Sequence, residues 1–318
     1  DGRTTGYVVR PVSAAGIYAP GGTAPLSSSV LMGVLPAKAA GVERIVLATP
    51  AKNGVVAPLT LVAAKECGVS EVYKMGGAQA IAALAYGTQS IKKVDVIAGP
   101  GNIYVTLAKK EVYGEVGIDM LAGPSEILII ADESANARYV AADVLSQAEH
   151  DVLARAILVT PSRSLAEAVA KEVELQLARL PRKEVVRKSI DTSGGIIVVG
   201  SLDEACALAN TVAAEHLEIC TEHPEALLPS ITHAGAVFLG HYTPEPVGDY
   251  FAGPDHILPT SGSAKFFQVL NEDTFTRKMS VISYTKEALF ADGVDIVRLA
   301  RSEQLDAHAN AVAIRLEE

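Results

Sequence analysis

Side chains able to exchange protons or bind metals gather in four short segments that lie far apart along the chain. They are the pair Glu215-His216, the run Ser146–His150, the segment Gly248–His256 and the segment Glu303–His308. Imidazole exchanges a proton near neutral pH, and a nearby carboxylate can activate water. Imidazole nitrogens and carboxylate oxygens are also common zinc ligands. A hydride-transfer enzyme with a metal site is the interpretation that uses all four segments.

Gln147 and His150 are three residues apart in a segment with helical periodicity, so both side chains can face one metal ion. Imidazole suits zinc, whereas an amide oxygen is a less usual ligand that needs support from a carboxylate. Asp249, in a loop rich in proline and glycine, could supply that carboxylate. The alternative is a histidine at a helix end that is solvated or contacts a carbonyl group, and this segment alone leaves both open.

Glu215-His216 stands where a predicted helix over residues 202–215 meets a predicted strand over residues 217–220. Adjacent side chains on a helix do not face each other, so both can converge on one site only if the helix ends here. The alternative is a polar helix terminus, where the dipole favours histidine. His256 is a candidate pocket residue, while Glu303 and His308 could equally belong to a solvated helix face.

Three glycine-rich turns, Ala19–Gly22, Gly76–Gln79 and Gly99–Asn102, each follow a predicted strand or extended segment. The last two precede predicted helices, where free backbone N–H groups and the helix dipole favour a phosphate group. None completes the GxGxxG fingerprint, and the chain has no GxxxxGK[ST] motif. The turns therefore fit either a nucleotide site or ordinary strand–helix geometry.

Short β-branched runs alternate with longer helical patterns along most of the chain. This alternation predicts an α/β fold with parallel sheets covered by helices on both faces, in two blocks that meet near residue 125. From about residue 271 the pattern changes to charged helical segments, which predict a C-terminal appendage. The predicted strands lie at residues 44–49, 71–75, 94–98, 126–131, 156–160 and 195–199, and the main helices at 56–68, 78–86, 104–113, 135–150, 165–180 and 202–215.

Composition limits the classes of function. The 318 residues suffice for two domains, and 49% of them are hydrophobic. The net charge of −10 argues against a nucleic-acid surface. No apolar stretch reaches the roughly 20 residues that span a membrane, and the N-terminus has no signal-peptide layout. The three cysteines, Cys67, Cys206 and Cys220, predict no disulfide framework, so we expect a cytoplasmic protein.

Several short strings, in order along the whole chain, resemble the histidinol dehydrogenase family. The resemblance implies an enzyme that oxidises L-histidinol through L-histidinal to L-histidine with two NAD⁺ in turn. The matching strings are residues 16–22, 76–79, 99–102, 118–119, 122–126, 147–150, 214–217, 248–250, 256–260 and 307–312.

The resemblance also implies a role for each candidate residue. Glu215 would activate water and His216 would take the hydroxyl proton. One zinc ion would be bound by Gln147, His150, Asp249 and His308, the last from the neighbouring subunit of a homodimer, and these residues with His216 would also contact the substrate. The remaining implied contacts are Ser125, His256 and the neighbouring subunit's Glu303 with the substrate, and Tyr18, Gln79 and Asn102 with NAD.

The fold implied by the resemblance consists of two incomplete Rossmann-like domains, one inserted in the other. Residues 1–17 and 125–270 would form the first, residues 18–124 the inserted NAD-binding domain, and residues 271–318 a helical tail that completes the partner's site. The family has a substantial segment before the position that matches Asp1, so we expect the first domain to lack its N-terminal part.

Two other functions remain open. A related zinc dehydrogenase acting on another alcohol, such as a sulfonated diol, would keep the metal ligands and Glu215-His216 but change the contacts to the imidazole. A non-catalytic fragment would only bind a nucleotide or a partner chain. The intact set of ligands argues against the second alternative, and the joint presence of Ser125, His256 and Glu303 favours histidinol.

Overall fold

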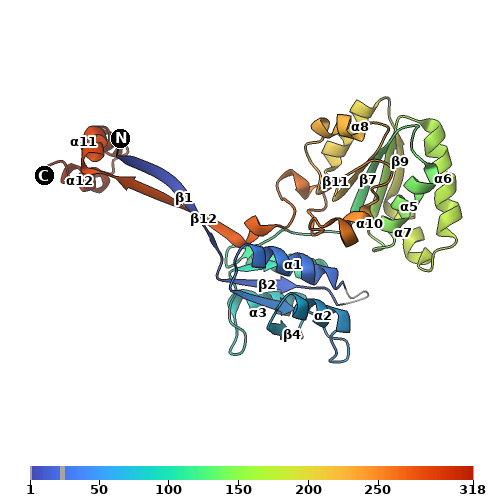
Figure 1. Cartoon of the computed structure of the whole chain (residues 1–318), viewed down its shortest axis with the longest axis horizontal. Helices are drawn as coiled ribbons and strands as arrows, with labels where there is room; N and C mark the ends of the chain where they lie inside the picture. Colours follow the sequence, from blue (N-terminus) through green and yellow to red (C-terminus); the bar gives the residue numbers. More distant parts are fainter. Residues whose placement is uncertain (1, 22–25, 318) are drawn as a thin grey trace. The chain divides into compact units, whose positions relative to one another are not determined.

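The computed structural model describes residues 2–21 and 26–317 (Figure 1), so Gly22 of the first glycine-rich turn lies outside the described residues. The chain divides into two compact units, one of residues 12–275 and one that joins residues 2–11 to residues 276–317. No helix among the described residues is both long enough and apolar enough to cross a membrane.

The first sheet of the larger unit is parallel, with strand order β4-β3-β2-β5-β6. The chain runs outward from β2 through β3 to β4 and then returns to β5 on the other side of β2. The carboxyl ends of β2 and β5 are therefore a topological switch point, where open α/β sheets bind ligands. The strands are β2 (Ala14–Tyr18), β3 (Arg44–Ala48), β4 (Glu71–Tyr73), β5 (Val96–Ala98) and β6 (Gly117–Ile118).

Two pairs of helices cover the two faces of this sheet. Alternate residues of β2 explain the arrangement, since Ala15 and Ile17 pack on one face and Ala14 and Tyr18 on the other. Helices α1 (Ser28–Ala39) and α2 (Pro58–Glu66) contribute to the first core, and α3 (Gly77–Tyr86) and α4 (Ile103–Val112) to the second.

The second sheet is also parallel, with strand order β11-β10-β7-β8-β9. Its central strand β7 is buried along its whole length, as its unbroken apolar run predicts. The strands are β7 (Glu126–Ala131), β8 (Arg155–Thr160), β9 (Gly194–Val198), β10 (His216–Cys220) and β11 (Ala236–Leu239).

Helices cover both faces of the second sheet as well. Apolar residues of α5, α6 and α7 pack with Ile127 and Ile129, whereas those of α8 pack with Leu128 and Ile130. The helices are α5 (Ala137–Ala148), α6 (Arg163–Leu177), α7 (Lys183–Ser193), α8 (Leu202–Val212), α9 (Pro224–Leu227) and the short α10 (Glu245–Val247).

The smaller unit is a two-stranded antiparallel ribbon with two helices. Strand β1 (Arg3–Pro11) pairs with β12 (Thr276–Tyr284) along its whole length, and α11 (Lys286–Ser302) and α12 (Asp306–Ala313) follow. The Arg3 guanidinium donates two hydrogen bonds of 2.7 Å to the Asp292 carboxylate, which ties the start of β1 to α11.

The predicted α/β class with parallel sheets and a helical C-terminal part is confirmed, but residues 1–17 lie elsewhere than expected. Strand β1 belongs to the ribbon and β2 to the sheet of residues 18–124, because a polar strand pairs with β12 while the apolar run 14–18 completes a buried sheet. The helix expected to end at Glu215 ends at Val212, since Ala213 adopts a left-handed conformation with φ of 51°.

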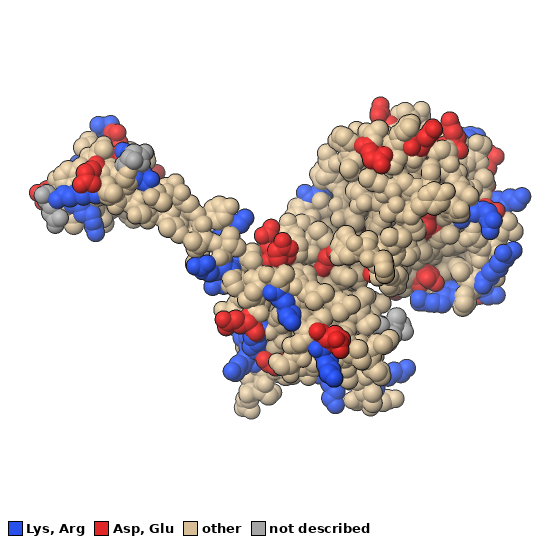
Figure 2. All heavy atoms as spheres, viewed as in Figure 1, with Lys and Arg blue, Asp and Glu red and all other residues tan. Residues whose placement is uncertain are grey.

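Acidic and basic side chains are interspersed over the surface that Figure 2 shows. The described part of this face therefore carries charges of both signs side by side. This agrees with the modest excess of 37 acidic over 27 basic residues in the sequence. A polyanion would need a clustered cationic surface to bind.

Close packing of α1 on β2 makes Gly33 a sensitive position. A Cβ atom there would lie 2.5 Å from Cγ2 of the fully buried Ile17. We expect Gly33→Ala to lower the free energy of unfolding by about 1–3 kcal/mol, although alanine is the better helix former. Urea denaturation would measure the change. The control is Gly6→Ala, where the new methyl group meets nothing within 4 Å. Equal stabilities of the two variants would contradict the packing argument.

Candidate active site

Glu215 and His216 lie at the amino end of β10, beside the amino end of the neighbouring strand β7. His216 is in register with Ile127, the second residue of β7. The backbone of Gly235 approaches the pair so closely that a Cβ atom would lie 2.5 Å from the carbonyl oxygen of Glu215. Gly235 and the left-handed Ala213 thus allow the chain to leave α8 and enter the sheet within a few residues.

The Glu215 carboxyl group is buried, with the residue only 7% exposed. Its Oε2 accepts a hydrogen bond of 3.0 Å from the backbone N–H of Glu126, and the Ser125 side chain is a further hydrogen-bond partner. Burial raises the pKa of Glu215 to about 8, and the neighbouring charges of Glu126 and Asp249 act in the same direction. This carboxyl group can therefore take up or release a proton close to neutral pH.

His216 is 3% exposed, and its Nδ1 lies 2.8 Å from Oε1 of Gln147. An amide oxygen only accepts, so Nδ1 carries the hydrogen and Nε2 keeps its lone pair. Nε2 has no hydrogen-bond partner among the described residues. Burial lowers the pKa of His216 to about 4, against the opposing charge of Asp249. The ring is thus neutral with a free nitrogen, the form that a general base requires.

Two carboxyl groups face this free nitrogen. Oε1 of Glu245 lies 4.0 Å from Nε2 of His216, and potential ligand atoms of His216, Glu245 and Asp249 all lie within 4.8 Å of one another. Burial raises the pKa of Glu245 to about 9, and its hydrogen bond to Asp249 adds to the shift. Glu245 therefore donates to the Asp249 carboxylate, which leaves one negative charge beside the imidazole.

The turn that carries Asp249 is held against the second sheet. Residues Gly248–Ala252 form a π-helical turn directly after α10. A Cβ atom at Gly248 would lie 2.7 Å from the ring of Phe238 on β11, so only glycine allows this approach. The backbone N–H of Glu245 donates a hydrogen bond of 2.8 Å to the buried Glu218.

Glu245 was not among the predicted site residues, although the sequence carries a signal for it. A carboxyl residue four positions before Asp249 in Pro244–Asp249 lies on the same side of a helical turn. The run of prolines and glycines instead indicated a loop, and a loop gives no reason to pair the two side chains.

Gln147 and His150 lie on either side of the end of α5 and differ in exposure. Gln147 is fully buried on the last turn of α5, whereas the helix ends at Ala148 and His150 lies in the exposed turn beyond it. His150 and the half-buried His256 are still close enough to His216 for their charges to lower its pKa. Nε2 of His256 has no partner among the described residues.

The larger unit thus gathers seven of the candidate residues, namely Glu215, His216 and five residues around them. The other two candidates for metal and substrate contacts belong to the smaller unit, where Glu303 follows the last residue of α11 and His308 lies on α12. Both are exposed. The seven gathered residues are Ser125, Gln147, His150, Glu215, His216, Asp249 and His256.

The three candidate cofactor residues lie at the carboxyl edge of the first sheet. Tyr18 ends β2, and its hydroxyl oxygen accepts a hydrogen bond of 3.1 Å from the N–H of Gly77. Gln79 is exposed on the first turn of α3. Asn102 caps α4, since its Oδ1 accepts hydrogen bonds from the N–H groups of Tyr104 and Val105.

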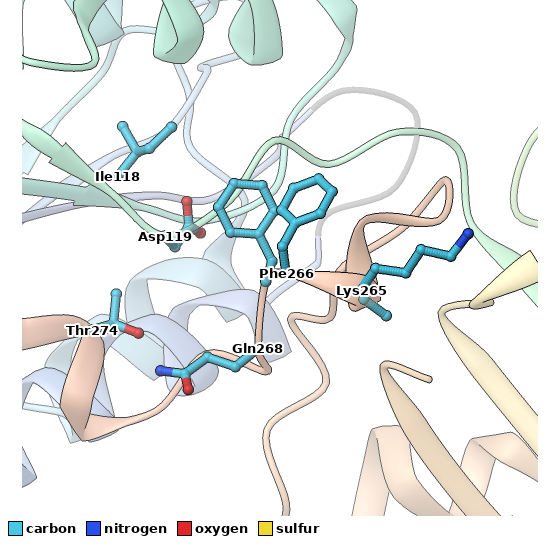
Figure 3. Close-up of a pocket in the computed structure, with 8 residues that line it drawn as sticks. Ile118, Asp119, Lys265, Phe266, Gln268 and Thr274 are labelled. Carbon is cyan, nitrogen blue, oxygen red and sulfur yellow. The ribbon is translucent and has the colours of Figure 1, made fainter. Parts of the chain in front are cut away.

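A cavity of about 410 Å³ lies apart from this chemistry. Figure 3 shows Ile118 and Asp119 on one side and the segment from Lys265 to Gln268 on the other, with Thr274 nearby. The cavity is lined by none of the acid–base or metal-ligand candidates. The active site is therefore identified by its acid–base and metal-ligand residues and not by the volume of a cavity.

Comparison with known proteins supplies the family. A sequence model of histidinol dehydrogenase matches residues 1–316. The histidinol dehydrogenases of Heliobacterium mobile and Bacillus cereus are 59% and 57% identical to this chain over 318 residues, which are 100% of this chain and 74% of each relative. The crystal structure of histidinol dehydrogenase from Elizabethkingia anophelis superimposes with a TM-score of 0.96 at 43% identity, covering 100% of this chain and 73% of that one. The chain belongs to the histidinol dehydrogenase family.

Proposed function

We propose that this chain oxidises L-histidinol through L-histidinal to L-histidine, the end of histidine biosynthesis, in the cytoplasm. The observation that carries the proposal is the buried hydrogen bond between His216 Nδ1 and Gln147 Oε1, which leaves Nε2 free beside two carboxyl groups. Family membership supports histidinol as the alcohol.

His216 acts as the general base in the first oxidation. Its Nε2 takes the proton of the substrate hydroxyl as a hydride leaves the adjacent carbon. The neutral ring and the free lone pair support this role. The negative charge on the Asp249–Glu245 pair then stabilises the imidazolium that forms.

Glu215 acts in the second oxidation. Its ionised carboxylate takes a proton from water as the water oxygen attacks the aldehyde carbon, and the alkoxide that forms takes a proton from the His216 imidazolium to give the hydrate. A hydroxyl group of the hydrate then gives its proton to Nε2 of His216 as the second hydride leaves, and the acid forms. The hydrogen bonds from Glu126 N–H and Ser125 hold the carboxylate in position for this step.

The donor set fits a zinc ion. An imidazole nitrogen of His150 and a carboxylate oxygen of Asp249 are ligand types that zinc binds, and both residues are close enough to His216 for their charges to change its pKa. We infer that Gln147, His150 and Asp249 hold zinc together with His308 of the partner subunit. When bound, zinc would hold the imidazole and amino nitrogens of the substrate and so fix its orientation.

When bound, NAD would supply the acceptor for each hydride. Tyr18, Gln79 and Asn102 are the residues that we assign to its binding, and their location at the switch point of the first sheet supports the assignment. Ser125 and His256 of the same subunit, together with Glu303 of the partner subunit, complete the substrate contacts. The active form is therefore a homodimer.

The test is NADH formation by the zinc-loaded chain with L-histidinol. We expect two NADH per histidinol, loss of activity with a chelator, and recovery when Zn²⁺ is restored. A folded, zinc-loaded chain that ignores histidinol but oxidises another alcohol, such as a sulfonated diol, would overturn the substrate assignment. A folded chain that binds NADH but oxidises no alcohol would overturn the enzymatic function.

His216→Asn should reduce kcat by about 10²- to 10⁴-fold, because the general base is lost. Zinc content after dialysis should not change, because His216 is not a metal ligand in this proposal. Steady-state kinetics and metal analysis measure the two effects. His223→Asn is the matched control, since His223 is exposed and far from β10's amino end. Undiminished activity in His216→Asn would refute the base role.

Mixing His216→Asn with His308→Ala tests the shared site. His308→Ala alone should bind zinc more weakly, which competition with a chelator measures. In a mixed dimer one site receives both changes and the other neither, so re-assembled mixtures should recover about a quarter of the wild-type activity. Recovery of none would show that both residues serve the same subunit's site.

Glu215→Gln should stop the reaction at the aldehyde, so about one NADH forms per histidinol and the aldehyde can be trapped. In the wild type, oxidation of L-histidinal should rise as pH increases through about 8, because only the ionised carboxylate activates water. A pH profile of L-histidinal oxidation that is the same in both proteins would contradict the role.

The same pKa affects stability. The folded-state pKa of Glu215 is raised from 4.5 to about 8, so its contribution to folding is present below pH 4.5 and is lost as pH rises through 8. The free energy of unfolding of the wild type should therefore fall relative to that of Glu215→Gln across this range. Denaturation of both proteins at several pH values measures the difference.

A further inference from the structure

Gly99, at the start of the turn Gly99–Asn102, is held at both of its peptide polar groups. Its N–H donates a hydrogen bond of 2.8 Å to Oδ2 of Asp119, and its carbonyl oxygen accepts one of 3.1 Å from Nζ of Lys109. Its φ of 116° suits glycine, and a Cβ atom would lie 2.1 Å from the carbonyl oxygen of Tyr18. The turn is thus pressed against the end of β2.

Lys109 and Asp119 form a buried ion pair. Their side chains are 2% and 1% exposed, and Nζ of Lys109 contacts Oδ1 of Asp119. Oδ1 also accepts a hydrogen bond of 2.7 Å from the N–H of Met120. Lys109 lies about two turns along α4, the helix that the turn itself begins, and Asp119 directly follows β6. The end of β5, the body of α4 and the end of β6 are therefore joined at Gly99.

Stability alone does not explain this pair. Removing two charges from water costs about as much as their attraction returns, and apolar side chains of similar volume often stabilise a protein equally well. Unlike apolar side chains, an ion pair can form directional hydrogen bonds. Its ammonium group donates to a C=O and its carboxylate accepts from an N–H, and both backbone groups are thereby held at fixed positions. Apolar replacements would leave both peptide groups of Gly99 buried without partners.

The turn Gly99–Asn102 lies where a ligand of the first sheet would bind. It follows β5, the neighbour of β2 at the switch point, and it leads into the N-terminus of α4. Gly99 joins this turn to β5, so the contacts that hold Gly99 help to fix the backbone that leads to the cap Asn102. Lys109 and Asp119 themselves are buried behind the turn, so they act through it and not by contact with a ligand.

We propose that Lys109 and Asp119 are positioning residues for the dinucleotide, because their ion pair holds the turn Gly99–Asn102 in the geometry that binds NAD. The inference rests on the proposed function, and it adds to that function two residues buried outside the cofactor contacts. The pair affects cofactor affinity and leaves the chemistry at Glu215 and His216 untouched.

The test is Lys109→Met in the zinc-loaded chain. The KM for NAD⁺ and the Kd for NADH should both rise by about tenfold, the factor expected from one or two lost hydrogen bonds. kcat and the KM for L-histidinol should stay within about twofold, which is the pattern of lost binding without lost transition-state stabilisation. The chain contains no tryptophan, so fluorescence enhancement of NADH gives the Kd without interference.

The matched control is Lys110→Met, the next lysine on α4, whose side chain is exposed. It should leave every constant unchanged. Lys109→Arg and the neutral double variant Lys109→Met with Asp119→Asn guard against a failure to fold, since they keep the charge or remove both charges. In either variant, a rise in the KM for NAD⁺ with unchanged kcat and unchanged KM for L-histidinol would support the inference.

Three outcomes would overturn the inference. They are wild-type affinity for NADH in folded Lys109→Met or in the folded double variant, a fall in kcat equal to any loss of NADH affinity in these variants, and failure of all the Lys109 variants to fold, which would assign the pair to stability. Failure of the proposed function gives another result, because the wild-type chain itself would then fail to oxidise histidinol, whatever its affinity for NADH.

Discussion

The parallel pairing of β10 with β7 is the constraint on which the active site depends. It sets His216 opposite Ile127, so the carboxyl group of Glu215 reaches the N–H of Glu126, beside Ser125. The parallel pairing of β7 with β8 determines where α5 ends, because the helix between these strands must run back to the amino edge before β8 begins. Gln147 on its last turn therefore meets His216. Residues almost seventy positions apart thus become partners through ordinary βαβ geometry.

This arrangement puts the reactive pair at an uncommon edge of the sheet. Open α/β sheets usually bind ligands at the carboxyl ends of their strands, and the turns around Tyr18 and Gly99 follow that rule in the first sheet. In the second sheet, Glu215, His216 and Ser125 lie at the amino ends instead. Burial then gives the pair its chemistry, since it lowers the pKa of the imidazole and raises that of the carboxyl group.

Much of the fold followed from local pattern. The apolar run of β7 and the alternation of strands and helices predicted two parallel sheets. Parallel strands that are buried on both faces are recognisable in a sequence as short continuous apolar runs. The ribbon of β1 and β12 was missed, because its strands are mostly exposed and carry no apolar alternation. The end of α8 was missed too, because a left-handed alanine at position 213 has no signature in the sequence.

The candidate site was predictable in part. The residue types of Glu215, His216 and Gln147 suggested proton and metal chemistry, and their roles came from the resemblance of whole motifs to one family. The contribution of Glu245 depends on burial and on its proximity to Asp249, which only the fold determines. The capping of α4 by Asn102 does not depend on the fold in this way. It follows from the residue type and from its position directly before a helix.

The use of opposite edges in the two sheets has an evolutionary consequence. The turns after β2, β4 and β5 belong to one sheet, while the residues around His216 belong to the other and to the segment after β11. Among the described residues, the candidates for cofactor contact and the acid–base pair lie on different turns. Mutations that alter the preferred alcohol and mutations that alter the preferred nucleotide can therefore accumulate separately, so a lineage could change one preference while it keeps the other.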